Sequence, residues 1–191
     1  MMRLSPAICF ALFALPSVLR GLDFAPREVE TEIEAGIVNK ELQFQDGKRR
    51  VLYQFPAGWR VSPRAGAVML TPPSVSQAEL IIDGEGIRDP RPVDAREISA
   101  CKEWVAASLP RESTAVEFEA ELVDGVSVHG CRTVELTVGF AYGNQSLRKC
   151  VWFVYADKTV IRFTVSARER DFARVKESVR GSLYSWRWVE N

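Results

Sequence analysis

The stretch from Tyr53 to Trp59, Tyr-Gln-Phe-Pro-Ala-Gly-Trp, constrains the fold more than any other part of this sequence. Pro56 fixes its own φ and has no N–H to donate, so a strand that enters this stretch must end at Phe55. Gly58 supplies the backbone freedom for a turn. We expect Trp59 to anchor that turn against the core, and the stretch predicts the opening turn of a compact domain.

Alternating apolar residues predict most of the remaining chain to be strands. Segments 42–44 and 51–55 flank an Asp46-Gly47 turn and predict a hairpin. Further strands are predicted at 67–70, 78–83, 115–122, 127–140, 147–155 and 159–165. Residues 22–36 alternate glutamates with apolar residues, which predicts either an edge strand or a solvated extended arm.

Two segments have helical spacing. The first runs from Val93 to about Ser108, where Ile98, Cys101 and Val105 recur on one side. The second runs from Glu169 to Leu183, and its apolar stripe consists of Phe172, Val175, Val179 and Leu183. Its other side is expected to face solvent with Arg174, Lys176, Glu177 and Arg180.

The strand at 147–155 carries apolar groups on both faces and therefore needs cover on both sides. Matching apolar faces across a turn near residues 142–145 places Val134 opposite Phe153 and Leu136 opposite Val151. A mid-chain helix, strands in meander order and a closing helix after 155–163 resemble the PsbP/DcrB-like α/β/α sandwich family, over residues 37–188. The resemblance implies an α+β fold, an antiparallel β-sheet with helices on both faces. It also implies a bacterial exported protein that binds other macromolecules, as most relatives do.

The N-terminus predicts export. Residues 1–21 read as a signal peptide or N-terminal export segment, with Arg3 before an apolar run too short for a membrane span. Residues 17–21 do not place small residues at both recognition positions of a cleavage site, which leaves an uncleaved anchor as the alternative. We therefore expect residues 22–36 as an arm or edge strand, residues 37–191 as a single domain, and a secreted or periplasmic location. Membrane contact is expected only through an uncleaved N-terminal segment.

Charge argues against a nucleic-acid partner. The chain has 25 basic and 25 acidic residues, and the densest basic run, residues 48–50, follows a hairpin turn. No basic stripe of the kind that binds phosphates is apparent.

The part of the chain after residue 21 contains three cysteines, Cys101, Cys131 and Cys150. Three thiols allow one disulfide and leave one over. The strand register separates Cys131 from Cys150, so Cys101 is the more plausible partner for either. Three buried free thiols are an equally weighted alternative.

Two surfaces are candidates for binding. The loop 84–92, with the neighbouring Asp83, Glu85, Asp89 and Arg91, joins a strand to a helix, and loops on rigid scaffolds often carry sites. The C-terminal aromatic segment, with Tyr184, Trp186 and Arg187, has a composition common in protein interfaces. The favoured interpretation of its two tryptophans, however, is that both cover the open end of the core.

No catalytic constellation, metal-ligand spacing or nucleotide fingerprint is present, so we expect no enzyme activity, metal or cofactor. The leading hypothesis is a non-catalytic domain that binds an envelope protein or assembly. The alternatives are a thiol-based redox protein, which requires an exposed cysteine of depressed pKa, and a small-ligand or cation carrier that uses the acidic loop.

Overall fold

The computed structural model describes residues 22–34, 37–87 and 89–190. The predicted export segment, residues 1–21, lies outside the described residues. Neither helix in the described ranges is long and apolar enough to cross a membrane.

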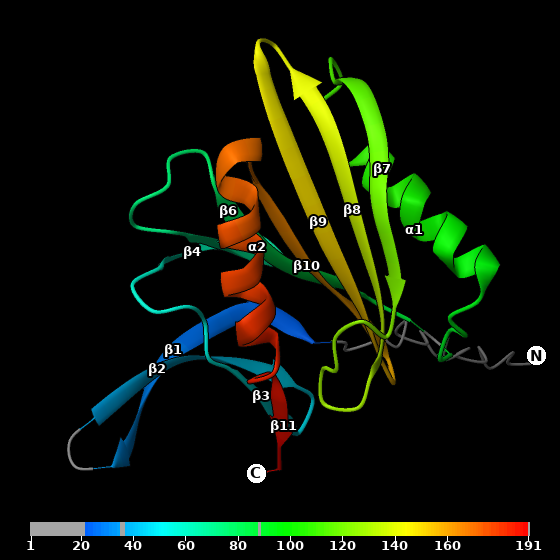
Figure 1. Ribbon diagram of the computed structural model, residues 1–191. Helices are drawn as coiled ribbons and strands as arrows, with labels where there is room; N and C mark the ends of the chain where they lie inside the picture. Colours follow the sequence, from blue (N-terminus) through cyan, green and yellow to red (C-terminus); the bar gives the residue numbers. More distant parts are fainter. Residues whose placement is uncertain (1–21, 35–36, 88, 191) are drawn as a thin grey trace, which may run out of the picture.

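A seven-stranded antiparallel sheet forms the body of the molecule (Figure 1). Its strand order is β4-β5-β6-β10-β9-β8-β7. The bounds are β4 Arg60–Arg64, β5 Ala67–Thr71, β6 Glu79–Gly86, β7 Thr114–Val123, β8 Arg132–Tyr142, β9 Gln145–Ala156 and β10 Thr159–Arg168. The strands β7 to β10 form the predicted meander, and β10 then pairs with β6, which joins it to the β4–β6 segment.

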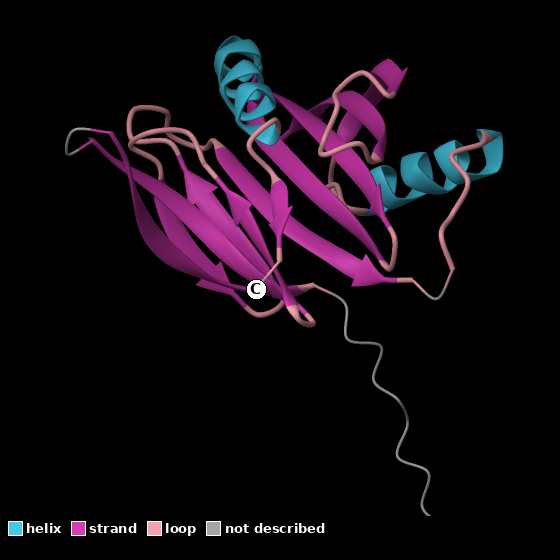
Figure 2. Ribbon diagram, turned by 90° about the horizontal axis from the view of Figure 1, so that it is seen from below, coloured by secondary structure: helices cyan, strands magenta, loops and turns pink. Residues whose placement is uncertain are grey.

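A second antiparallel sheet has the order β1-β2-β3-β11. Its strands are β1 Asp23–Glu34, β2 Ile37–Asp46, β3 Arg49–Tyr53 and β11 Arg187–Val189. Residues 22–36 therefore contribute an edge strand, β1, rather than a solvated arm. Figure 2 shows this sheet beside the larger one, with the C-terminus on it.

The two helices lie against opposite faces of the larger sheet (Figures 1 and 2). Helix α1, Ala95–Ala107, starts at Asp94, whose carboxylate accepts a hydrogen bond of 2.9 Å from the backbone N–H of Glu97. Helix α2, Glu169–Leu183, buries its predicted stripe of Phe172, Val175, Val179 and Leu183.

The predicted α/β/α sandwich is wrong. Strands account for 55% of the chain and helices for 17%, and the structure consists mainly of two antiparallel sheets. The face that α2 covers is covered also by the second sheet, and both contribute to one core. The sequence pattern predicted parts of β2 and β3, and β1 as one of two alternatives. It did not predict β11, nor that these strands pair with one another instead of extending the first sheet.

The larger core lies between the two sheets and α2. Phe44 and Tyr53 of the second sheet, Phe163 of β10 and Trp186 meet there, and Trp186 is 1% exposed. A smaller core lies under α1, where Val105 packs with residues of β8 and β9 such as Phe153. The two faces of β9 thus enter different cores, as the pattern at 147–155 predicted.

The predicted register is confirmed, because Val134 pairs with Phe153 and Leu136 with Val151. The strand predicted at 127–140 starts later, at Arg132, because His129 and Gly130 adopt positive φ in a tight turn. At the stretch from Tyr53 to Trp59, β3 ends at Tyr53, two residues before the predicted end. Trp59 donates to the carbonyl of Pro56 at 3.3 Å and is 9% exposed, as expected of an anchor.

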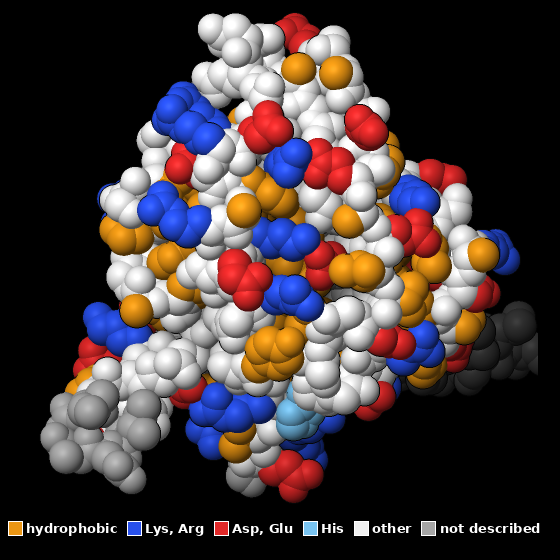
Figure 3. Space-filling view, in the orientation of Figure 1, with side chains coloured by type: hydrophobic (Ala, Val, Ile, Leu, Met, Phe, Trp, Pro, Cys, Tyr) orange, Lys and Arg blue, Asp and Glu red, His pale blue; other side chains and the backbone are white. Residues whose placement is uncertain are grey.

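Helix α2 differs from expectation at one residue that was assigned to its solvent face. The ammonium of Lys176 lies 2.6 Å from a carboxylate oxygen of Glu135 on β8, which is 2% exposed. The indole N–H of Trp152 donates to the other oxygen of the same carboxylate. Elsewhere, the face over α2 carries basic and acidic side chains intermingled (Figure 3). Lys176 thus joins α2 to the sheet through an ion pair in which the carboxylate is buried and the ammonium is partly exposed.

Candidate functional site

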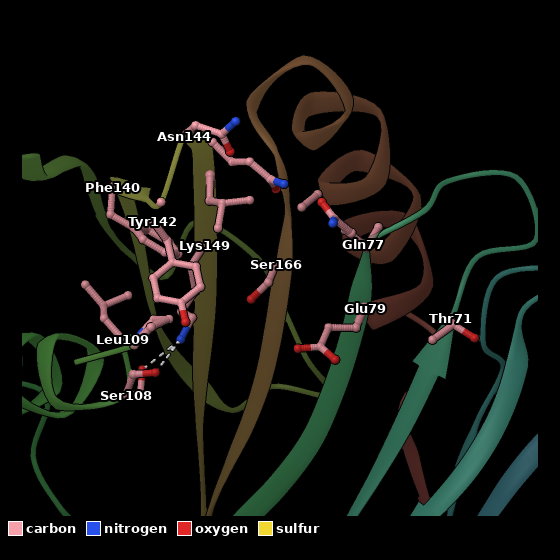
Figure 4. A pocket seen from close by; sticks show the side chains of 16 residues that line it. Thr71, Gln77, Glu79, Ser108, Leu109, Phe140, Tyr142, Asn144, Lys149 and Ser166 are labelled. Atoms are coloured by element: carbon pink, nitrogen blue, oxygen red, sulfur yellow. Dashed lines mark hydrogen bonds between the residues drawn. The ribbon is translucent and has the colours of Figure 1, made fainter. Parts of the chain in front are cut away.

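A groove of about 900 Å³ opens on the α1 face of the larger sheet, beyond the end of α1. We call it the α1-end groove. Its walls come from the residues after α1 (108–110), the β8–β9 hairpin, the start of β6 and the end of β10 (Figure 4). Its volume lies in the range of ligand-binding pockets.

Lys149 forms one wall of the α1-end groove. It lies on β9, is 8% exposed, and donates to the carbonyl oxygen of Ser108 at 2.8 Å and to the hydroxyl of the same residue at 3.1 Å. Helix α1 has no basic residue in its last turn, so Lys149 supplies a positive charge at the negative end of the helix dipole. Burial lowers the pKa of Lys149, and the carboxylate of Glu79 acts in the opposite direction.

The floor of the groove is a row of polar residues that crosses three strands. Lys149 on β9 pairs with Ser166 on β10, and Ser166 pairs with Glu79 on β6. Residues in register on adjacent strands project to the same face. In Figure 4, Glu79 points into the groove from the side opposite Lys149. Within the described residues, the carboxylate of Glu79 has neither a hydrogen bond nor an ion pair.

The β8–β9 hairpin gives the groove an aromatic and amide rim. Phe140, Tyr142 and Asn144 line this side, and Tyr142 is 45% exposed. Gly143 forms the turn with a φ of +59°, which brings this rim over the groove. The groove thus combines an exposed phenol, a buried ammonium and an unpaired carboxylate.

The predicted acidic loop is largely strand, because β6 continues to Gly86. Asp83 and Glu85 therefore project from the sheet, and Arg162 of β10 forms ion pairs with both. Arg91 bridges Glu85 and Glu97 at 3.1 and 3.5 Å. Asp89 is exposed and apart from this network.

This network continues beneath α1. Glu97 accepts a hydrogen bond of 3.0 Å from the hydroxyl of Tyr155, which lies 3.1 Å from the thiol of Cys101. The guanidinium of Arg162 stacks over Trp104 at 4.6 Å. The charged groups of this network are paired with one another, which fits a role in holding α1 on the sheet. In the described ranges no three His, Cys, Asp or Glu side chains are grouped so that they could hold a metal ion.

The C-terminal candidates separate in the structure. Tyr184 is 60% exposed at the end of α2, whereas Trp186 is 1% exposed in the core, where burial prevents direct contact with a partner. Trp186 therefore closes the core, which was the favoured interpretation of its sequence position. Arg187 forms an ion pair of 2.9 Å with Glu41, which is itself 2% exposed.

The three cysteines are free thiols. Cys101 and Cys150 are buried in the two different cores, on opposite faces of the sheet, and Cys131 is partly buried. Burial raises the pKa of Cys101 to about 11 and of Cys150 to about 12, and it also raises the pKa of Cys131. These shifts are opposite to the one that a reactive thiolate requires.

Sequence reasoning missed the α1-end groove, although one signal for it was present. Lys149 interrupts the apolar face formed by Leu147, Val151 and Phe153, and a charged residue at an inward position is unusual. Glu79 gave no such signal, because its position opposite Lys149 depends on the pairing of β6 with β10.

Comparison with known proteins identifies a similar fold but no related sequence. No protein-family model matches the chain, and no curated protein matches it. Among solved structures, cyanobacterial PsbP (CyanoP) from Synechocystis sp. PCC 6803 is similar with a TM-score of 0.52 and 14% identity, over 82% of this chain and 97% of that one.

LpqN of Mycobacterium tuberculosis, described as involved in cell envelope biogenesis, is similar with a TM-score of 0.51 and 10% identity. The match covers 86% of this chain and 91% of LpqN. At these identities the likeness concerns the fold, since one fold hosts many functions. The chain has a PsbP/DcrB-like fold.

Proposed function

We propose that this chain is an exported, non-catalytic module of the cell envelope that binds an envelope protein or assembly, and that the α1-end groove receives a segment of that partner. The observation that carries the proposal is the groove itself. It is hollow, it is lined from several rigid elements, and it contains the buried ammonium of Lys149 beside the exposed ring of Tyr142. Tyrosine is enriched in protein interfaces.

The state of the other polar groups supports binding over chemistry. Asp83, Glu85 and Arg91 belong to an ion-pair network that holds α1, which argues against the cation-carrier alternative at that loop. The raised pKa values of the three thiols argue against the redox alternative. An envelope setting is supported by the apolar run in residues 1–21 and by LpqN, whose description concerns the envelope.

Affinity capture from envelope extract tests this proposal, with tagged residues 22–191 as bait. Tyr142→Ala removes an aromatic ring from the groove. Tyr184→Ala is the matched control, because it makes the same substitution at an exposed tyrosine at the end of α2, away from the groove. We expect a partner that wild type and Tyr184→Ala recover and Tyr142→Ala loses. Loss in Tyr184→Ala alone would move the binding surface to the C-terminal segment. Capture of nothing by a folded bait would refute the proposal.

A further inference from the structure

We infer that the α1-end groove recognises an extended peptide segment that carries an acidic and a basic side chain about three residues apart, with the acidic group at Lys149 and the basic group at Glu79. The inference rests on the proposed function, because it specifies what kind of partner segment the groove accepts.

Lys149 has donor capacity left for a ligand. An ammonium has three N–H donors, and the two bonds from Lys149 both go to Ser108. No carboxylate of the described residues lies within ion-pair distance of Lys149. A buried ammonium without an ionic partner attracts an anion more strongly than an exposed one, because less water screens it.

Glu79 offers the opposite charge on the far side of the groove floor. Its carboxylate is half-buried, points into the groove and has no hydrogen bond or ion pair with the described residues (Figure 4). Glu79 and Lys149 are too far apart to neutralise each other directly, since no ion pair joins them, yet their charges influence one another. The groove therefore has one positive and one negative end.

The spacing of the two ends selects the ligand. Lys149 and Glu79 stand in one row on strands separated by β10, so their backbones are about 10 Å apart at about 4.8 Å per strand. A peptide in the extended polyproline II conformation rises about 3.1 Å per residue with three residues per turn, so side chains three residues apart lie roughly 9 Å apart and project to the same side. Ser166 in the middle of the row, together with Asn144 and Gln77 on the rims, can hydrogen-bond the peptide backbone between the two charges.

End-capped Gly/Ser hexapeptides of four compositions test this inference, each titrated into isotope-labelled residues 22–191 and followed by NMR. The first composition carries aspartate and lysine three positions apart. In the second the aspartate is replaced by asparagine, and in the third the lysine is replaced by glutamine. The fourth has both replacements. The first is supplied in both sequence orders. We expect it to bind about tenfold more tightly than either singly charged peptide, the size expected of one charge-assisted hydrogen bond. The shifted resonances should lie at residues 77–79, 108–110 and 140–149.

Glu79→Gln assigns the basic end of the peptide. In this variant, replacing the lysine of the peptide should no longer weaken binding, whereas replacing the aspartate should still do so. The aspartate is varied in the peptide, and Lys149 is left intact, because Lys149 also holds the end of α1.

Equal affinity of all four peptides, shifts outside the groove, or an unchanged lysine preference in Glu79→Gln would each overturn the inference. If Tyr142→Ala still loses a captured partner in that case, the proposed function stands and only the charge recognition falls. If the peptides behave as expected but no partner is captured, the groove chemistry stands and the proposed function falls.

Discussion

Replacing Trp186 by alanine should destabilise the protein strongly without altering its surface. Trp186 is 1% exposed, and its ring lies 5.2 Å from that of Phe44, 5.8 Å from Tyr53, 5.1 Å from Phe163 and 6.1 Å from Trp188. Truncating a buried tryptophan to alanine costs about 3–5 kcal/mol, and each aromatic pair contributes about 0.5–1.5 kcal/mol beyond its buried area. That truncation cost already includes the lost ring contacts, and four aromatic pairs place Trp186→Ala at its upper end, so we expect a loss of about 4–5 kcal/mol in the free energy of unfolding.

Urea denaturation of residues 22–191, followed by far-UV circular dichroism, measures this loss. At about 2–4 °C per kcal/mol for a chain of this size, Tm should fall by about 8–20 °C. Tyr184→Ala is the matched control, because that ring is 60% exposed and its removal should change stability by less than about 0.5 kcal/mol. A loss below about 1.5 kcal/mol for Trp186→Ala would refute the placement of this ring at the junction of the two sheets.

A further variant separates packing from hydrogen bonding at the same site. The indole nitrogen of Trp186 is buried without a hydrogen-bond partner among the described residues. Trp186→Phe therefore sacrifices no hydrogen bond and should cost only about 1–2 kcal/mol, from the smaller ring. For the same reason Trp186→Ala is unsuitable as a surface variant in binding experiments, since any loss of binding would report unfolding.

Three other outcomes follow from the buried polar groups and thiols. Lys176→Met leaves the carboxylate of Glu135 buried without its cation, and should lower the free energy of unfolding, measured in urea, by about 2–3 kcal/mol. This value is the usual cost of breaking a buried ion pair, reduced because Lys176 is partly exposed. A loss below about 1 kcal/mol would contradict the ion pair. Without denaturant at pH 8, a maleimide should label Cys131 first and should reach Cys101 and Cys150 only after unfolding, so rapid labelling of either buried thiol would refute their burial. Because the pKa of Cys150 is about 12 when folded against an ordinary 9, its unfolded thiol ionises first, and Cys150 alone lowers stability above pH 9, by about 2 kcal/mol at pH 10.5. Cys101, whose pKa is raised to about 11, adds to this loss. Denaturation at pH 8 and 10.5 should show this loss in wild type and a smaller one in Cys150→Ala, and equal losses would contradict it.

The sequence was sufficient where local pattern decides the structure. The stripe of α2, the pairing of Val134 with Phe153 and the two-faced burial of β9 depend on periodicity and on one hairpin turn. The start of α1 at Asp94 similarly depends on a side chain that caps the helix locally. These features lie close together in the chain, so residues a few positions apart determine them.

The sequence was insufficient where distant segments meet. The second sheet depends on β11 pairing with β3, which lies more than 130 residues earlier in the chain, and no local pattern indicates that pairing. The α1-end groove depends in the same way on β6 lying beside β10. Lys176 was assigned to solvent because its carboxylate partner, Glu135, lies on a distant strand. Partners of this kind appear only after the strand order is known.

Hydrogen–deuterium exchange of residues 22–191, alone and with the captured partner, tests the central claim most directly. The claim is that the α1-end groove is where the partner binds. Slower exchange should then appear at residues 105–110, at 77–81 and along the β8–β9 hairpin from 140 to 147. Unchanged exchange in these segments, with protection confined to residues 184–190 or to the β1–β2 hairpin, would contradict the claim.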